Sequence, residues 1–261
     1  LASVTIPSGV ARVGRSAFED CTALTSMTLP SGVTCIEEGA FQRCKALASV
    51  TIPEGVTRIE DNAFYGCYAL RSVALPSTLS HLGDCAFEYS GLEAVAIPEG
   101  VTRIGEYAFE GCKNLTQVSL PASLTSIGNG AFASCDALGQ GEGVVIRDGW
   151  VLKTNDKTLS EVSLRAGLRG IGADAFGGCS SLWAVTIPEG VVSIGDAAFA
   201  YCPNLVTINI PASVREIGFS AFEGCDRLGA GEGVVIRNGW VLKTDGACPT
   251  SVILHSGTRG I

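Results

Sequence analysis

The chain has 261 residues, of which 46% are hydrophobic and 17% are charged, and its formal net charge is −8. A chain this apolar can bury a core, so its composition excludes intrinsic disorder. The negative charge argues against nucleic acid or an anionic lipid surface as the main partner, and no apolar run reaches the roughly 18 residues that a membrane span needs.

An internal repeat runs through the sequence. The dipeptide Ala-Phe occurs nine times, usually 23 residues after the previous copy, with one step of 22 and one of 44. The copies begin at Ala17, Ala40, Ala63, Ala86, Ala108, Ala131, Ala175, Ala198 and Ala221. A repeat this short cannot bury its own apolar face and must stack on its neighbours. The sequence therefore predicts a single α/β solenoid over residues 1–261, coiled in a right-handed sense.

Within one repeat, residues 47–52 predict a short strand. The alternation of β-branched residues places Val50 and Ile52 inward, and Pro53 ends the strand because it lacks an N–H donor. The segment 53–55, Pro-Glu-Gly, predicts a type I turn with proline in its second position. The apolar residues that follow are expected to return to the core.

The Ala-Phe segment that comes next predicts a short helix or 3₁₀ turn. Ala63, Phe64, Cys67 and Leu70 are three or four residues apart, which places them on one helical face. Asp61 precedes them, where a carboxylate suits a helix N-terminus. We therefore expect a parallel β-sheet on one face of the solenoid and short helical turns on the other.

Eight cysteines recur at one position of the repeat. Stacked coils would hold these side chains parallel and about 5 Å apart, which fits disulfide geometry poorly. We expect free thiols that pack as small apolar groups, and Ser90 at the same position agrees with packing rather than bonding. The spacing also lacks the close pairs of a zinc site, so no metal is expected. The eight residues are Cys21, Cys44, Cys67, Cys112, Cys135, Cys179, Cys202 and Cys225.

The pattern Leu-x-x-Val-x-Ile-Pro…Val-x-x-Ile…Ala-Phe-x-x-Cys-x-x-Leu resembles the BspA-like, treponemal-type leucine-rich repeat family over essentially the whole chain. The resemblance implies a leucine-rich-repeat solenoid that is secreted or displayed at the cell surface, with a role in adhesion and no catalytic residues. The chain departs from the pattern at Ser90, which replaces cysteine, and at Arg165 and His255, which replace proline. The resemblance transfers no binding specificity.

The sequence starts at Leu1, without methionine or a charged leader. We interpret it as a piece of a longer extracellular or cell-surface protein whose signal peptide is already gone.

Two insertions near residues 139–158 and 229–248 predict β-hairpins. Their centres, GEGVVIRDGWVLKT (141–154) and GEGVVIRNGWVLKT (231–244), differ at one position. Asp-Gly or Asn-Gly between two alternating apolar runs is the strongest short signal for a hairpin with a type I′ turn. The pairing would place Arg147 opposite Trp150, and Ile146 opposite Val151.

These hairpins supply candidate partner-binding residues, because tryptophan and arginine dominate binding hot spots. The candidates are Trp150 and Arg147 on the first hairpin, and Trp240 and Arg237 on the second. The alternative is that each tryptophan covers the apolar side of its own hairpin with the arginine laid over it. Trp183, at an outward position of a strand beside small residues, is the fifth candidate.

The sequence indicates no enzyme, cofactor or metal site. The motifs of nucleotide-binding and hydrolase sites are absent, and His81 takes a surface position that arginine occupies in other repeats. The arginines Arg12, Arg58 and Arg103 are expected to be neutralised by acids beside them. The recurring acids are expected to start helices and to aid solubility; they are Glu37, Glu38, Glu60, Asp61, Asp84 and Glu106.

The sequence suggests three functions. An ice- or crystal-binding plane of threonines fails because the series breaks at Ala74, Ala96 and Ser119. A structural spacer that presents other domains remains the alternative. We favour a non-catalytic recognition or adhesion module that binds a protein or glycan, including host matrix proteins, and that is monomeric and neither binds nucleic acid nor inserts into a membrane.

Overall fold

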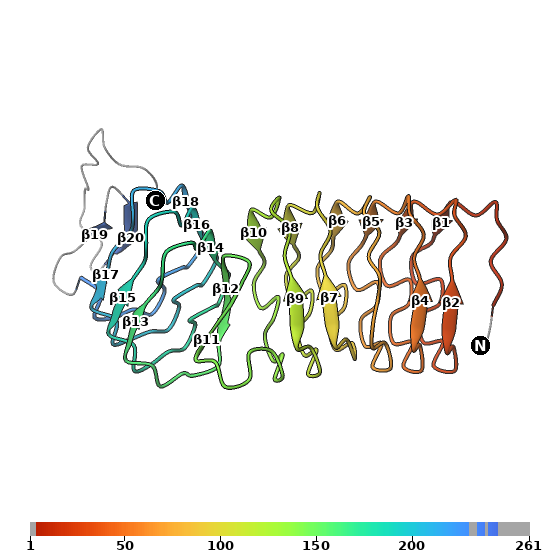
Figure 1. The fold of residues 1–261 in the computed structure, drawn as a ribbon. Coiled ribbons are helices and arrows are strands. Elements are labelled where there is room, and N and C mark those ends of the chain that lie inside the picture. The colour runs from red at the N-terminus through yellow and green to blue at the C-terminus, as the bar shows by residue number, and fades with distance from the viewer. Residues whose placement is uncertain (1–3, 230–233, 238–239, 245–261) are drawn as a thin grey trace. The chain divides into compact units, whose positions relative to one another are not determined.

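The structure is a computed structural model that describes residues 4–229, 234–237 and 240–244. It consists of two compact units, Leu1–Gln140 and Gly141–Ile261, in which short strands alternate with turns (Figure 1). Each unit is a parallel-strand β-solenoid built from repeats of about 23 residues. That residues 1–261 form one continuous solenoid stays a prediction.

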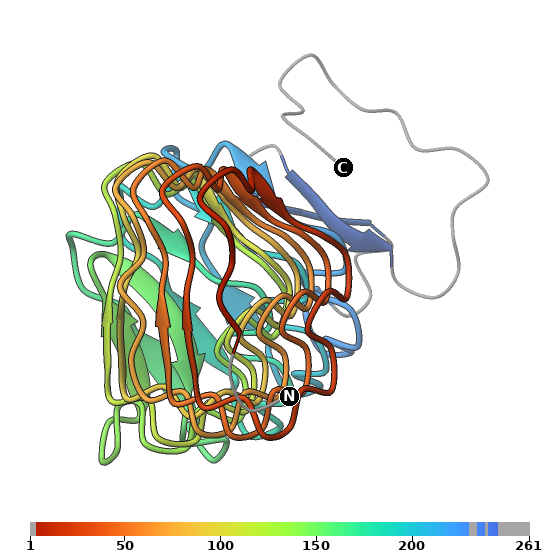
Figure 2. The same ribbon diagram turned by 90° about the vertical axis from the view of Figure 1, so that its right-hand side faces the viewer.

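The first unit has two strand positions in its repeat rather than one, although residues 71–76 form no strand in the coil of β6. Two-residue strands form a six-stranded parallel sheet, and three-residue strands form two separate parallel pairs. In Figure 2 the coils of this unit lie behind one another. The six-stranded sheet contains β1 (Arg12–Val13), β3 (Cys35–Ile36), β5 (Arg58–Ile59), β6 (His81–Leu82), β8 (Arg103–Ile104) and β10 (Ser126–Ile127). The pairs are β2 (Ser26–Thr28) with β4 (Ser49–Thr51), and β7 (Ala94–Ala96) with β9 (Gln117–Ser119).

The second unit repeats this arrangement and adds hairpins. Its larger sheet has the order β11-β12-β14-β16-β18, so the second strand of the first hairpin takes part in the solenoid sheet. The strands of this sheet are β11 (Val144–Arg147), β12 (Trp150–Thr154), β14 (Gly170–Ile171), β16 (Ser193–Ile194) and β18 (Glu216–Ile217). The others are β13 (Glu161–Ser163), β15 (Ala184–Thr186), β17 (Thr207–Ile208), β19 (Val234–Arg237) and β20 (Trp240–Thr244).

The strand predicted over 47–52 forms as β4, and its inward residues are confirmed. Val50 and Ile52 are buried while the residues between and beside them face solvent. The following turn differs from the prediction. The N–H of Val56 donates to the carbonyl oxygen of Pro53, and Gly55 has φ 105°. Proline is therefore the first residue of this turn and glycine the third, which fits type II, because a positive φ at the third position favours glycine.

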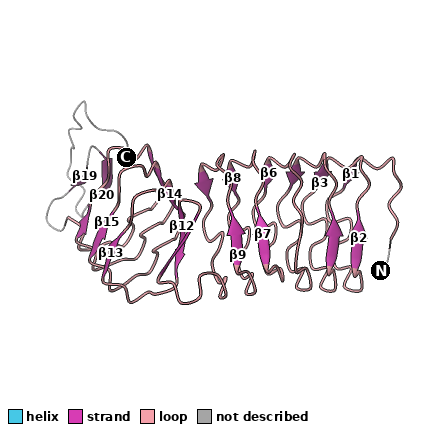
Figure 3. Ribbon diagram, viewed as in Figure 1, coloured by secondary structure: helices cyan, strands magenta, loops and turns pink. Residues whose placement is uncertain are grey.

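The predicted helical face is wrong. None of the described residues forms a helix, and Figure 3 shows only strands and loops. The reason lies in two left-handed residues in each Ala-Phe segment, such as Asn62 and Gly66 with φ of 58° and 68°. A right-handed helix needs an unbroken run of negative φ, so these residues stop it.

Hydrogen bonds explain why the left-handed residues occur there. The N–H groups of Asn62, Phe64 and Gly66 donate to carbonyl oxygens of the next coil at 2.7 to 2.9 Å. The intervening N–H groups of Ala63 and Tyr65 donate three residues back along the chain. Because alternate amides bond between coils, the helical pattern of donation four residues back cannot form.

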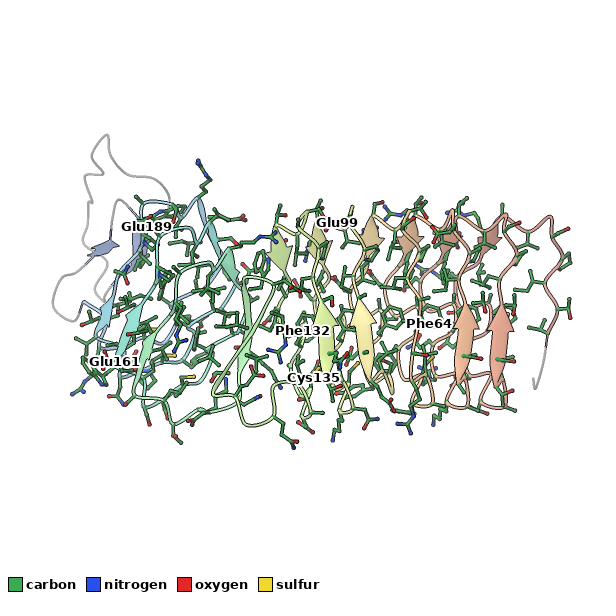
Figure 4. The ribbon with its side chains drawn as sticks, viewed as in Figure 1. Phe64, Glu99, Phe132, Cys135, Glu161 and Glu189 are labelled. Atoms are coloured by element: carbon green, nitrogen blue, oxygen red, sulfur yellow. The ribbon has the colours of Figure 1, made fainter. Side chains whose placement is uncertain are left out.

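The core contains a continuous stack of phenylalanine rings. From Phe18 to Phe132 the ring centroids are 5.1 to 5.6 Å apart and nearly parallel. Phe176, Phe199 and Phe222 continue the pattern within the second unit. Figure 4 labels Phe64 and Phe132 of this stack, and also Cys135, which is fully buried. Each repeat thus stabilises its neighbours by burying one aromatic face against the next.

Candidate functional site

The first hairpin forms with the predicted register. Arg147 pairs with Trp150 and Ile146 with Val151, and Asp148 and Gly149 both have positive φ, as a type I′ turn requires. The second hairpin pairs Arg237 with Trp240 in the same way. Its turn residues, 238–239, and the side chain of Arg237 lie outside the described part of the chain.

The hairpin tryptophans are buried in their own unit. Trp150 is 1% exposed and Trp240 is 7% exposed. The ring of Trp150 lies on Gly170 of the next coil, where an added Cβ would overlap the ring. These side chains have no free face for a partner, so their burial supports the structural alternative for both residues.

Arg147 is held by a carboxylate rather than laid over Trp150. Its two terminal nitrogens each donate to one oxygen of Glu142 at 3.0 Å, and one of them also donates to the carbonyl oxygen of Ile146. The hydrogen bonds from Arg147 lower the pKa of Glu142. The guanidinium is therefore mostly satisfied within the hairpin.

Trp183 is the one candidate whose ring faces solvent, with 48% of the residue exposed. It directly precedes β15, where its N–H donates to the carbonyl oxygen of Ser160 and its own carbonyl accepts from Val206. Val206 holds the same position on the next coil and is 45% exposed. An apolar patch of Trp183 and Val206 thus lies beside the smaller sheet of the second unit. Val206 was not predicted, since a lone valine carries no binding signal.

Asn209, which directly follows β17, has a structural role. Its side-chain amide accepts from the N–H of Ile187 and donates to the carbonyl oxygen of Ile187, both at 2.7 Å. These two bonds extend the pairing of β15 and β17 by one peptide.

The ten described cysteines are free, and they include the eight at the repeat position for which free thiols were predicted. They also make a contact that packing arguments missed. The Cys67 thiol donates to the carbonyl oxygen of Phe41 at 3.2 Å, and that oxygen also accepts the N–H of Cys44. In the same way, the Cys135 thiol donates to the carbonyl oxygen of Phe109. Burial raises the pKa of the Cys44 and Cys112 thiols to about 11. A thiol with so high a pKa is a poor nucleophile.

Acids neutralise the basic series on the six-stranded sheet, as predicted. Arg12 pairs with Glu37 at 2.9 Å, and Arg58 pairs with Glu60 at 2.6 Å. Glu60 also lies 3.2 Å from the Nε2 atom of His81. Exposed pairs of this kind contribute little stability, and they leave no anion-binding stripe.

The acids at the start of the turns do not begin helices. The Oδ1 atom of Asp61 accepts the N–H of Asp84 on the next coil at 2.8 Å, and Asp84 accepts the N–H of Glu106 in the same way. These carboxylates therefore join coils. Among the described residues, no group of three or more His, Cys, Asp or Glu side chains could hold a metal ion. No helix in that part of the chain could cross a membrane.

The fold and these side chains define a class: a repeat protein of stacked parallel coils whose polar side chains mostly bond coil to coil. The family model described as the BspA type leucine rich repeat region matches six copies, over residues 1–103, 36–140 and 154–230. The chain belongs to this family. Leucine-rich repeats are generally non-catalytic, and the family is consistent with protein interaction or a surface role.

Two solved structures support the fold. The chain is similar to a leucine-rich repeat protein from Bacteroides ovatus, with 26% identity, a TM-score of 0.52, and coverage of 84% of this chain and 81% of that one. It is equally similar to a leucine-rich repeat protein from Eubacterium ventriosum, with 26% identity and a TM-score of 0.52, covering 80% of this chain and 60% of that one. Among curated proteins, no sequence matches.

Proposed function

We propose that the chain is a non-catalytic recognition module that contacts a protein or glycan partner through the sheet face around Trp183. The observation that carries the proposal is that Trp183 and Val206, two exposed apolar residues, take the same position on adjacent coils beside this sheet. The neighbouring residues of this sheet, Ser163, Thr186 and Thr207, are exposed and small. A half-exposed indole is a typical hot-spot residue, because it buries a large area at low entropic cost.

The proposal also includes the cellular location of the protein. Membership of the repeat family supports an extracellular or cell-surface location, which antibody labelling of intact cells would test. The net charge of −8 supports a partner other than nucleic acid. We expect the module to act as a monomer that is not inserted into a membrane.

A spacer is the second candidate. The exposed positions of β2 and β4 in the first unit carry only serine and threonine, as a coil that merely adds length would. This function predicts no specific partner for either unit.

The experiment compares the wild-type chain with Trp183→Ala on a glycan array and in pull-downs against purified matrix proteins. Tyr201→Ala is the control, because Tyr201 is 61% exposed on a turn segment of the same unit. The proposal expects Trp183→Ala to weaken binding at least about tenfold with an unchanged melting temperature, while Tyr201→Ala binds normally. Equal binding by all three proteins would contradict the site, and specific binding by none would favour the spacer.

A further inference from the structure

The turn segments of the first unit carry a second group of aromatic and acidic residues at the surface, of which Tyr68 and Tyr89 are exposed and the others half-buried. It is here called the tyrosine–glutamate cluster: Tyr65, Tyr68, Glu88, Tyr89 and Glu110. Glu88 and Glu110 each follow the core phenylalanine of their coil. The two coils are adjacent, because the N–H of Tyr89 donates to the carbonyl oxygen of Glu110 at 2.7 Å. The two carboxylates therefore stack in register.

The two carboxylates of the cluster have no ion-pair partner in the described part of the chain, although the charge of Arg43, one coil earlier, acts on Tyr65. Glu19 takes the same position in an earlier coil, and there Arg43 binds it at 2.6 Å. Among the described residues, no basic side chain lies within ion-pair distance of Glu88 or Glu110. Burial and the charge of Glu88 raise the pKa of Glu110. The carboxylates thus repel each other in a half-buried setting, where a cation would be attracted.

Aromatic rings border these carboxylates. Tyr65 and Tyr89 meet edge to face with centroids 5.8 Å apart, and the charge of Glu110 raises the pKa of Tyr89. Tyr68 is 55% exposed and Tyr89 is 36% exposed. Aromatic faces attract ammonium and guanidinium groups, most strongly where carboxylates add their field.

We propose that the tyrosine–glutamate cluster binds a lysine- or arginine-bearing segment of a polypeptide partner. Charge complementarity selects the basic side chain, and the exposed tyrosine rings supply contact for its alkyl stem. This inference rests on the first unit alone and does not depend on the role of Trp183.

The test uses the full chain and a capped twelve-residue peptide of alternating lysine and serine, with a glutamine–serine peptide as the neutral control. Titration calorimetry should show binding of the lysine peptide only. The affinity should fall several-fold between about 0.05 and 0.3 M salt, because salt screens exposed charges.

Variants separate a local site from the overall charge. Glu88→Gln with Glu110→Gln should weaken binding about tenfold, and Tyr68→Ala should weaken it about threefold. The matched control is Glu161→Gln with Glu216→Gln, which removes the same charge from exposed strand positions of the second unit. This control should bind within about twofold of the wild type. Loss of the stacked carboxylates should not lower the melting temperature, because they repel each other.

Three results would overturn the inference. The first is equal weakening by both glutamine double variants, which would reflect net charge alone. The second is that the Tyr68→Ala variant and the Glu88→Gln, Glu110→Gln double variant both bind the lysine peptide as tightly as the wild type does. The third is the absence of any lysine-peptide binding at millimolar concentration.

Discussion

Single side chains in this solenoid are tied to the coil before or after their own. The Cys67 thiol bonds the Phe41 carbonyl oxygen, 26 residues earlier, and the glycine at position 170 makes room for a ring 20 residues earlier. The effect of a substitution therefore depends on the neighbouring coil.

Cys67→Ala should lower the free energy of unfolding by about 1–2 kcal/mol, because it removes a buried hydrogen bond and leaves a small cavity. Cys67→Ser should cost less, because a hydroxyl keeps the donor, and the buried Ser90 is a native example. Urea unfolding measures both. An alanine variant as stable as the wild type would contradict the thiol bond.

Gly170→Ala should destabilise the second unit by about 2–3 kcal/mol, because its methyl group overlaps the Trp150 ring. Adding Trp150→Leu should recover part of that loss, which a double-mutant cycle detects. The control should be another small substitution near Gly170. Gly178→Ala is unsuitable, because the φ of Gly178 is 71° and favours glycine. Ala173→Ser is therefore the control. Additive effects of the two substitutions would rule out the contact.

At the scale of the element, the turn segment depends on its phenylalanine stack. Phe109 is fully buried between Phe87 and Phe132, so Phe109→Ala should cost about 3–5 kcal/mol. Phe18 is half-buried and stacks only on Phe41 among the described rings, so Phe18→Ala should cost clearly less. Chemical denaturation of both variants tests this, and equal small losses would mean that the stack is not the core.

Because the cysteines at the repeat position are buried, we expect the stability of the protein to fall at alkaline pH. Burial raises the folded-state pKa of Cys44 and Cys112 to about 11, above the value of about 8.5 for an unfolded thiol. Their contribution is therefore complete below about pH 8.5 and is lost as pH rises through about 11. The free energy of unfolding should fall over this range, and less steeply in Cys112→Ser. Identical slopes would show that tyrosines, which titrate in the same range, cause the loss.

Local sequence patterns predicted the strand around Val50 and the first hairpin better than they predicted the Ala-Phe segment. The alternation around Val50 and the Asp-Gly turn before Trp150 each have one physical interpretation, and both were confirmed. The spacing of Ala63, Phe64 and Cys67 fits a helix. It fits equally well a series of turns in which N–H groups donate to carbonyl oxygens three residues earlier. The left-handed φ of Asn62 separates the two. Glycine and asparagine favour such a φ, but other coils have Ser16, Cys85 or Tyr107 at this position, so the residue type does not signal it consistently.

At the scale of the whole molecule, periodicity was enough to predict stacked parallel coils, and the family match agrees. The candidate site was harder to predict. Trp150 is buried because its ring lies on Gly170 of the next coil, whereas Trp183 is half-exposed. Residues that meet across two coils are 20 or more positions apart in sequence, so their contact can be inferred only from the register of the coils.

We propose that Trp183 contacts the partner, and acrylamide quenching of tryptophan fluorescence can detect this contact. The chain has three tryptophans, of which Trp150 and Trp240 are buried and Trp183 is 48% exposed. In the free protein, a quenchable component should be present in the wild type and absent in Trp183→Phe. Saturation with the partner found in the binding screen should protect that component in the wild type. A bound complex in which Trp183 is quenched as readily as in the free protein would contradict the claim.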